Sequence, residues 1–377
     1  MLTTFPVVTL TGPRQSGKTT VCRKLFPEMP YLNLERITTI NQLKADPERF
    51  ISNYTNGAII DEAQNYPEIF SLVQVIVDDD IFKGRTDRHF ILTGSSNLAL
   101  LSKVTQSLAG RTSVLSLLPL SISELNEEQR NLPSDELIFK GGYPTIWANA
   151  KDPTTIYSSY YDTYVERDLR QIMNIKDLSA FDRFVRLCAG RIGTEYNATA
   201  LSNEVDVSRQ TIDSWMSVLQ TSYIVHLLPP YYENIRKRLV KSPKIYFYDT
   251  GLASFLLGIE NAKQISTSPF RGQLFENMVV NEMIKMHTNT GKDAHLFFYR
   301  DQSQHEVDIL SQHAQMLELY EIKSGMSFNG TYYKGIKYLK NIFKDRIVRS
   351  SVIYDGSTDI DRDDEGLYNF RRFRQLC

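Results

Sequence analysis

A chain of 377 residues is longer than one ordinary hydrophobic core supports, and its length predicts two or three domains. Its net charge of −1, with 42% hydrophobic and 23% charged residues, is typical of globular proteins and excludes a global positive field that attracts nucleic acid. Apolar runs end well short of a membrane span, and no signal peptide precedes the first expected strand, so we expect a cytoplasmic protein.

The first motif, GPRQSGKT, has the spacing of a phosphate-binding loop. The apolar run at 5–10 predicts a strand before it, and the run at 20–26 predicts a helix after it. Two glycines let successive N–H groups point at phosphates, and the helix adds its positive N-terminal end. We therefore predict an ATP site in which Lys18 contacts the β- and γ-phosphates and Thr19 ligates Mg²⁺. The candidate ATP-binding residues are Gly12, Pro13, Arg14, Gln15, Ser16, Gly17, Lys18, Thr19 and Thr20.

A second apolar strand is expected at 58–62, and it ends in two carboxylates, Asp61 and Glu62. In a phosphate-loop fold, an acid at this place faces Mg²⁺ through the Thr19 hydroxyl or through water. The adjacent Glu62 is then placed to polarise the attacking water as a general base. The pair is expected to complete the site begun by Lys18.

The strand expected at 89–97 ends in small polar residues. We predict that Ser95 senses the γ-phosphate, with Asn97 as the second choice, although Ser96 and Asn97 also suit a helix cap. Arg111 precedes another strand, expected at 114–120. It is a candidate for stabilising transition-state charge, in its own site or across a subunit boundary, and a surface ion pair is the alternative.

Strands that alternate with helices from Met1 to about Pro119 predict a parallel sheet with helices on both faces. In such a sheet the site lies at the carboxyl ends of the strands. The helical segment that follows, 124–174, is broken by a Gly-Gly-Tyr-Pro turn at 141–144, which is either close to a ligand or a plain connection between helices.

Two helices are expected at 198–205 and 208–219, separated by a short turn, with candidate strands at 224–228 and 244–248. This order is that of a winged helix-turn-helix, whose second helix can enter a DNA major groove. Protein interaction is the alternative role for such a module. The residues predicted to contact DNA are Arg209 and Gln210 on the second helix and Arg236, Lys237 and Arg238 in a basic run at 236–244.

The C-terminal part carries a second constellation. Glu276 lies on a helix in apolar company, Asp308 lies in a short strand, and Glu321 and Lys323 share one face of the next strand. An Asp followed by Glu-x-Lys is the arrangement of PD-(D/E)xK nucleases, in which Asp308 and Glu321 would hold Mg²⁺. Lys323 would position or deprotonate water, and Glu276 would complete the catalytic set. A domain that binds DNA without cutting it, or an inert scaffold, is the alternative.

The segments GPRQSGKTT, IIDEAQ, LTGSS, LAGR and PLSISEL occur in this order, followed by 141–144 and 164–168. Together they resemble the bacterial and archaeal AAA+-type ATPases that join this domain to a winged helix and a restriction-endonuclease-like domain. The resemblance implies an α/β fold with a P-loop core at 1–122, a helical lid at 123–178, a winged helix at 179–258 and a nuclease-like domain at 259–377.

The function expected from this resemblance is Mg²⁺-dependent ATP hydrolysis, coupled to the winged-helix and nuclease-like modules and acting on DNA. The alternative is a nucleotide-driven switch that binds protein or DNA while the nuclease-like domain stays inert. An oligomer is compatible with either function.

Overall fold

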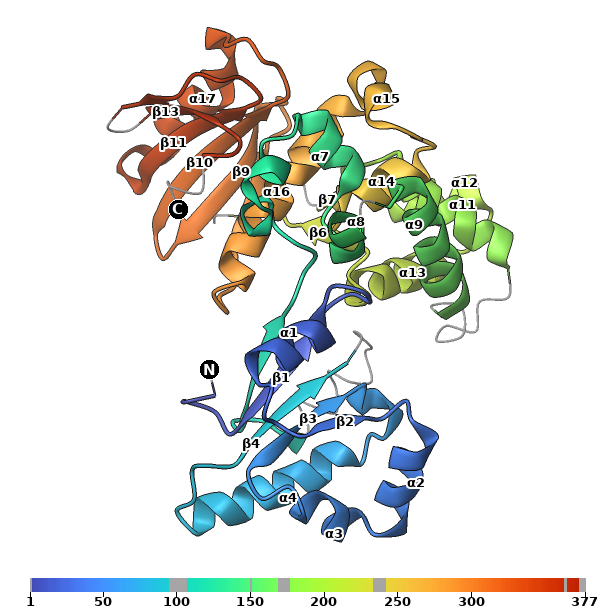
Figure 1. Cartoon of the computed structure of the whole chain (residues 1–377). Coiled ribbons are helices and arrows are strands. Elements are labelled where there is room, and N and C mark those ends of the chain that lie inside the picture. The colour runs from blue at the N-terminus through green and yellow to red at the C-terminus, as the bar shows by residue number, and fades with distance from the viewer. Residues whose placement is uncertain are drawn as a thin grey trace. The chain divides into compact units, whose positions relative to one another are not determined.

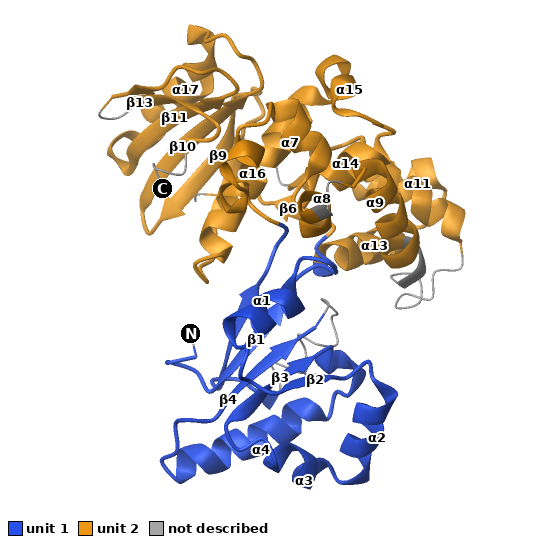
Figure 2. Cartoon of the chain, in the orientation of Figure 1, with its two compact units in different colours: residues 1–119, 221–223 blue, residues 120–220, 224–377 orange. Residues whose placement is uncertain are grey.

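The computed structural model describes residues 2–94, 107–149, 151–168, 177–232, 242–362 and 365–372 (Figure 1). The chain divides into two compact units (Figure 2). The first, the N-terminal unit, comprises residues 1–119 with 221–223, and the second, the C-terminal unit, comprises residues 120–220 with 224–377. The four-part division expected from the sequence is finer than this one, and its inner boundaries stay predictions.

The N-terminal unit is built on a five-stranded sheet in the order β2-β3-β4-β1-β5. Every neighbouring pair in it is parallel, as the sequence predicts. Its strands are β1 (Val7–Thr11), β2 (Tyr31–Asn33), β3 (Gly57–Asp61), β4 (His89–Thr93) and β5 (Thr112–Ser116). Its helices are α1 (Lys18–Leu25), α2 (Ile37–Ala45), α3 (Pro47–Ser52) and α4 (Ile69–Phe82).

Helices cover both faces of this sheet because its central strands are apolar on both sides. In β3, Ile60 packs in the cluster shared with α2, α3 and α4, whereas its neighbour Ile59 packs with Cys22 of α1 on the other face. The strand expected at 114–120 was misplaced, because β5 spans Thr112–Ser116. It pairs with β1 residue by residue up to Thr11 and Ser116. Because β1 ends at Thr11, the residues after Ser116 have no β1 residue to pair with.

The C-terminal unit begins with short helices and the helix-turn-helix segment. These helices are α6 (Glu127–Arg130), α7 (Ser134–Lys140), α8 (Pro144–Asn149), α9 (Pro153–Tyr160), the π-helical η3 (Tyr161–Asp168), α11 (Leu178–Ala189), α12 (Ala198–Val205) and α13 (Arg209–Thr221). An antiparallel pair of strands follows, β6 (Val225–Leu228) and β7 (Lys244–Phe247). The two helices and two strands thus lie within two residues of the positions expected from the sequence.

A mixed six-stranded sheet, β12-β13-β11-β10-β9-β8, forms the rest of this unit. Its strands are β8 (Leu296–Arg300), β9 (Glu306–His313), β10 (Met316–Lys323), β11 (Ile347–Tyr354), β12 (Ile360–Asp361) and β13 (Glu365–Asn369). The accompanying helices are α14 (Thr250–Leu256), α15 (Ala262–Thr267), α16 (Arg271–Thr288) and α17 (Lys334–Phe343), with short 3₁₀ turns between elements.

The long helix α16 lies at the centre of this unit. Ten of its eighteen residues are buried. Its apolar residues belong to one hydrophobic cluster that extends from Leu125 to Phe370 and includes α7, α11, α13 and β7. The helix therefore joins the helix-turn-helix segment to the mixed sheet through one continuous core.

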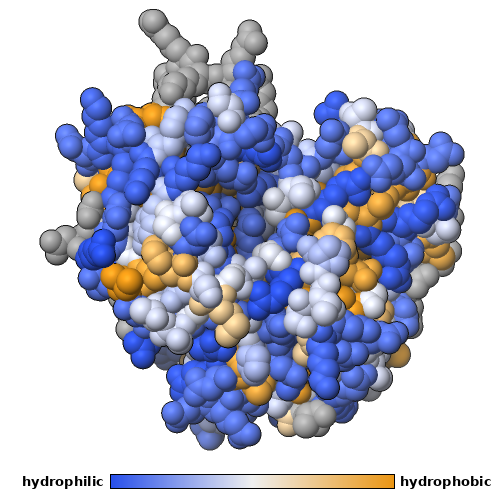
Figure 3. All heavy atoms as spheres, turned by 90° about the horizontal axis from the view of Figure 1, so that it is seen from above, coloured by the Kyte–Doolittle hydropathy of each residue, from blue (hydrophilic) through white to orange (hydrophobic). Residues whose placement is uncertain are grey.

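No helix among the described residues is long and apolar enough to cross a membrane. On the face drawn in Figure 3, most residues are hydrophilic and the hydrophobic ones form small separated groups.

Candidate functional site

The loop between β1 and α1 has the backbone shape that its glycines predict. Gly12, Gln15 and Gly17 all have positive φ, at 142°, 62° and 95°. A Cβ at Gly12 would lie 2.2 Å from the carbonyl oxygen of Leu117, so only glycine fits there. The hydroxyl of Ser16 is buried and has no hydrogen-bond partner among the described residues. An unpaired buried donor in a loop of inward-facing backbone fits a phosphate group.

Lys18 opens α1 and turns back into the loop. Its Nζ donates to the carbonyl oxygens of Gly12 at 3.0 Å and Pro13 at 2.7 Å, and the side chain is buried. Burial lowers the pKa of Lys18 to about 8, although the nearby carboxylates of Glu62 and Asp61 raise it in part. The ammonium is thus held inside the loop at a cost that an anionic ligand relieves.

Asp61 is buried at the carboxyl end of β3, and three hydroxyls donate to it. The Thr19 Oγ1 lies 2.9 Å from its Oδ2, the Tyr31 hydroxyl lies 2.5 Å from the same oxygen, and Thr93 of β4 donates to Oδ1. The link between Thr19 and Asp61 is the arrangement predicted from the sequence. These oxygens suit Mg²⁺, a hard ion that is usually bound by few protein oxygens together with substrate phosphates and water.

Glu62 follows Asp61 in a left-handed conformation, with φ 54° and ψ 47°. This region is uncommon for a residue with a Cβ, and such strain concentrates at functional sites. Gln64 donates to the Glu62 carboxylate and orients it. Gln64 is the last residue of the IIDEAQ segment, but no role was predicted for it from the sequence.

The other residues predicted for this site are Ser95, with Asn97 as the second choice, and Arg111. Ser95 and Asn97 lie outside the described residues. Arg111 lies at the amino end of β5 and forms a two-pronged ion pair with Asp78 of α4, with one contact at 3.0 Å. The phosphate loop leaves the carboxyl end of the adjacent, parallel β1, which is one five-residue strand away, or roughly 17 Å. Arg111 therefore does not reach phosphates held by its own chain.

The second constellation does come together, in the C-terminal unit. Lys323 Nζ lies 2.6 Å from Glu321 and 3.6 Å from Asp308. The pairing of β9 with β10 stops at Ile309 and Tyr320, and beyond it the Asp308 carboxylate accepts the N–H of Ile322 at 2.7 Å. The two strands therefore separate where the carboxylates are, and the freed backbone donor is satisfied by Asp308 itself.

Glu276 on α16 joins the same cluster. Its Oε1 accepts from Lys244 Nζ at 3.2 Å and from the Tyr246 hydroxyl at 2.5 Å. Lys244 also lies 2.6 Å from Glu306, at the start of β9. We call Glu276, Glu306, Asp308, Glu321, Lys244 and Lys323 the acid–lysine cluster. Lys244, Tyr246 and Glu306 were not found from the sequence, where Lys244 was merely the last member of a basic run.

Burial and close charges shift the pKa values of several residues in the acid–lysine cluster. Burial and the Asp308 charge raise the pKa of Glu321 to about 8, against the opposing effect of Lys323. Burial also raises the pKa of Glu276, while Lys244 opposes the shift. Burial alone would lower the pKa of Lys323, but Asp308 and Glu321 outweigh it and raise that pKa. The Oε2 of Glu321 is buried and has no hydrogen-bond partner among the described residues, so one acceptor of the cluster is left for another positive group.

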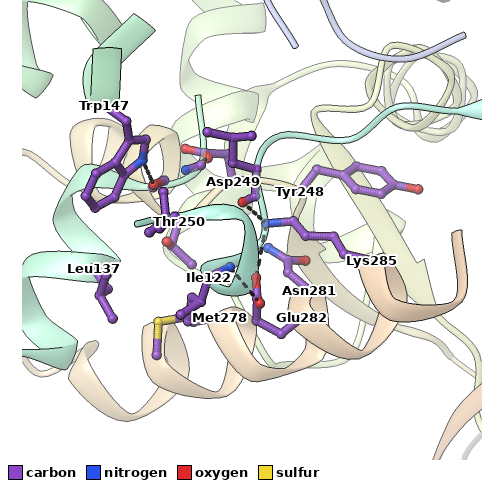
Figure 4. A pocket seen from close by; sticks show the side chains of 14 residues that line it. Ile122, Leu137, Trp147, Tyr248, Asp249, Thr250, Met278, Asn281, Glu282 and Lys285 are labelled. Atoms are coloured by element: carbon purple, nitrogen blue, oxygen red, sulfur yellow. Dashed lines mark hydrogen bonds and ion pairs between the residues drawn. The ribbon is translucent and has the colours of Figure 1, made fainter. Parts of the chain in front are cut away.

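A small cavity lies elsewhere on α16, beside residues 120–122 (Figure 4). Glu282 accepts the N–H of Ile122 at 2.9 Å, and Lys285 donates to Glu282 at 3.3 Å and to the Leu120 carbonyl at 2.9 Å. Its volume, about 30 Å³, matches about one water molecule. Gly141 and Gly142 of the turn at 141–144 also line it, and Asp249 on its wall accepts the N–H of Gly142.

The residues predicted to contact DNA are described only in part. Arg209 and Gln210 are exposed in the first turn of α13, and Arg209 forms a weak surface pair with Asp213 at 3.6 Å. Arg236, Lys237 and Arg238 lie outside the described residues.

The phosphate loop, its lysine and the hydroxyl-bound aspartate, placed at the carboxyl ends of a parallel sheet, define a P-loop nucleotide-binding domain. Residues 4–126 match the family described as AAA domain. Residues 133–263 and 271–373 match two further families, described as domains of unknown function DUF8612 and DUF4143. The N-terminal unit is therefore a nucleotide-binding ATPase domain of the AAA+ type.

The chain is also similar to several individual proteins. Uncharacterized proteins of Mycobacterium tuberculosis and Mycobacterium bovis are each 29% identical over 321 residues, or 84% of this chain and 70% of theirs. One from Methanocaldococcus jannaschii is 24% identical over 366 residues, or 87% of this chain and 78% of its own. Among solved structures, the Walker-type ATPase of Pyrococcus abyssi has a TM-score of 0.43 at 13% identity, covering 67% of this chain and 91% of that one.

The buried lysine generates a test of pH dependence. Because the folded-state pKa of Lys18 is about 8 and the unfolded value is about 10.4, charged Lys18 destabilises the nucleotide-free protein fully below pH 8. That penalty disappears as the pH rises from about 8 to about 10.5. We expect wild type to gain up to about 3 kcal/mol of unfolding free energy relative to Lys18→Met across this range.

Scanning calorimetry of both proteins at several pH values measures the difference. The relevant transition is the one that ATP shifts in wild type. A difference between the two proteins that stays constant with pH would contradict a lowered Lys18 pKa.

Proposed function

We propose that this protein is a Mg²⁺-dependent ATP hydrolase whose nucleotide state controls a DNA-binding and nuclease-like C-terminal unit. The observation that carries the hydrolase proposal is the link between Thr19 on the phosphate loop and Asp61 on β3, at 2.9 Å. It places a hydroxyl and a carboxylate together beside the Lys18 ammonium, as a Mg²⁺–ATP complex requires.

Each residue of the site then has a defined task. The loop backbone and Lys18 bind the phosphates, while Thr19 and Asp61 supply oxygens for Mg²⁺, which would neutralise charge that develops on the phosphates. Glu62, oriented by Gln64, accepts a proton from the attacking water. Ser95 is proposed to orient that water. Arg111 is proposed to act on ATP bound to a second copy of the chain, because its place at the amino end of β5 separates it from its own loop.

ATP hydrolysis tests this assignment. Lys18→Ala is expected to lower the hydrolysis rate by at least about 100-fold, because it removes a charge from both ground-state and transition-state phosphates. Glu62→Gln is expected to keep ATP binding and lose roughly 10²–10⁴-fold in rate, because only proton transfer is affected. Phosphate release and a fluorescent ATP analogue measure the two effects.

The matched control is Lys44→Ala, an exposed lysine on α2 of the same unit, which should hydrolyse ATP like wild type. Hydrolysis that survives Lys18→Ala would overturn the assignment of the site.

We further propose that α12, α13, β6 and β7 form a winged helix that binds DNA. Its support is the order of two helices and an antiparallel strand pair, with Arg209 and Gln210 exposed on the first turn of the second helix. The basic residues Arg236, Lys237 and Arg238 would contact phosphates. Arg209 is paired with Asp213, so binding requires that this exposed ion pair opens, which costs little.

Fluorescence anisotropy with duplex DNA at one fixed salt concentration tests this role. The Arg209→Ala, Gln210→Ala double variant should bind about tenfold or more weakly, since each base contact contributes about 1–3 kcal/mol. Lys263→Ala, an exposed residue of α15, is the control. ATP should change the affinity of wild type but not of Lys18→Ala. Equal DNA affinity in all proteins would leave protein interaction as the role of the module.

The acid–lysine cluster supports a nuclease-like role for the mixed sheet. Asp308, Glu321 and Lys323 form one ion-paired group at the point where β9 and β10 separate, and Glu276 contributes from α16. No three His, Cys, Asp or Glu side chains in the described part of the chain are arranged to hold a metal by themselves. The two carboxylates Asp308 and Glu321 would therefore share Mg²⁺ with water and a DNA phosphate, an arrangement common for this ion.

In this role Mg²⁺ would polarise the scissile phosphate and acidify a bound water. Lys323 positions that water. Incubation of plasmid DNA with Mg²⁺ or Mn²⁺ is expected to give nicked or linear product that Asp308→Ala and Lys323→Ala abolish. Asp345→Ala, an exposed acid after α17, is the control and should cut like wild type. DNA that stays intact with every metal would remove the nuclease and favour the alternative, a nucleotide-driven switch with an inert cluster.

A further inference from the structure

Lys244 occupies an unusual place for a lysine. Its side chain is 3% exposed, and its ammonium lies between two carboxylates, 3.2 Å from Glu276 and 2.6 Å from Glu306. Phe298 covers it, with the ring centroid 5.3 Å from Nζ. A buried ammonium persists only where carboxylates offset its desolvation, so the charge of Lys244 depends on both of these acids.

Lys244 is also fixed by its backbone. It opens β7, which pairs with β6 through Leu228, and it bridges to Glu195 on its other side. Tyr246, two residues on and therefore on the same face of the strand, donates to the same Glu276 oxygen. The lysine cannot leave the cluster without displacing the strand.

The charges of the acid–lysine cluster do not balance. The cluster holds the carboxylates Glu276, Glu306, Asp308 and Glu321 against the ammonium groups of Lys244 and Lys323. Arg300 at its edge lies 3.2 Å from Glu195 and 3.7 Å from Glu306, and counting Arg300 together with Glu195 adds one charge of each sign. When all four carboxylates are ionised, as a bound cation favours, four negative charges against two positive ones leave an excess of two, which one divalent cation balances. The unpartnered Oε2 of Glu321 belongs to the carboxylate that Lys323 contacts, and not to either acid that pairs with Lys244.

We infer that Lys244 is a built-in cation that keeps Glu276 and Glu306 out of metal coordination, so that the cluster binds a single divalent cation through Asp308 and Glu321. This inference rests on the nuclease-like role proposed above. Lys244 is a positioning residue, since it acts through Glu276 and Glu306. In its absence, among the described residues, Glu306 keeps only Arg300, at 3.7 Å, and Glu276 keeps only the uncharged Tyr246 hydroxyl, so the two acids form a second cation site.

Counting bound Mn²⁺ tests this inference without relying on activity. The probe is Mn²⁺ itself, with free ion measured by electron paramagnetic resonance, in nucleotide-free full-length protein. All proteins carry Thr19→Ala, which removes the hydroxyl ligand at the phosphate loop. We expect one Mn²⁺ per chain with Lys244 present, none with added Asp308→Asn, and two with added Lys244→Met, which keeps most of the length of the side chain without its charge.

Lys244→Arg is the charge-keeping control and should restore a count of one, whereas a merely structural lysine would give the same count in the Met and Arg variants. Circular dichroism checks that each variant is folded. If Lys244→Met does not fold, the inference is tested by the number of Mn²⁺ ions per chain that the Thr19→Ala protein loses when Asp308→Asn is added. A difference of two Mn²⁺ ions overturns the inference, and a difference of one supports it.

The inference and the proposed function fail in different ways. No Mn²⁺ bound by the Thr19→Ala protein refutes the nuclease-like cation site itself, and the role of Lys244 with it. A count of one Mn²⁺ per chain both with and without the added Lys244→Met substitution, at the same affinity, refutes the role of Lys244 alone.

Discussion

The structure of the C-terminal unit depends on the double hydrogen bond between Asn277 and the backbone of Phe247. The Phe247 N–H donates to Asn277 Oδ1 at 2.9 Å, and Asn277 Nδ2 donates to the Phe247 carbonyl at 2.7 Å. Asn281, one turn further along α16, adds a second donor to that carbonyl at 2.8 Å. All these groups are buried, and a buried backbone donor or acceptor left without a partner costs about 1–3 kcal/mol.

This bond fixes the register of β7 against α16, and the acid–lysine cluster follows from it. Glu276 is the neighbour of Asn277, and Lys244 and Tyr246 share the face of β7 that meets Glu276. A shift of one residue in β7 would turn Ile245 and Phe247 towards the carboxylate instead. The geometry of the charged cluster is therefore set by an uncharged pair of amides beside it.

The site of the N-terminal unit was more predictable from the sequence than the site of the C-terminal unit. Each of its functional residues follows a short apolar strand, and parallel strands bring their carboxyl ends to one edge, so Lys18, Thr19 and Asp61 were bound to meet. Tyr31 and Thr93, which complete the hydrogen bonds of Asp61, were missed because a Tyr or Thr in a strand carries no distinct signal. The direction of the strands also determines where Arg111 lies. A residue before β5 lies at the opposite end of the parallel strands from the loop after β1.

In the C-terminal unit, the alternation of β10 predicted the shared face of Glu321 and Lys323, and the helix of Glu276 was readable from its apolar neighbours. Lys244 was not readable in this way. It lies 32 residues before Glu276 and meets it through tertiary packing alone. A charged residue at the end of a basic run is indistinguishable in sequence from a solvated one, because burial depends on what packs against it.

The carboxylates of the two sites have different hydrogen-bond partners. Asp61 is surrounded by hydroxyls, which can rotate and turn a lone pair towards a cation, so the Mg²⁺ proposed for this site would displace no charge. Asp308 and Glu321 face the Lys323 ammonium, which has no lone pair and competes with a cation for Asp308 Oδ2 and Glu321 Oε1. Of the two lysines, Lys323 is 32% exposed and is able to swing towards solvent or a phosphate, whereas Lys244 is 3% exposed and held by its strand. The proposed cation binding at this cluster would therefore require movement of Lys323 alone, and this separates the lysine proposed for chemistry from the one proposed to set the charge.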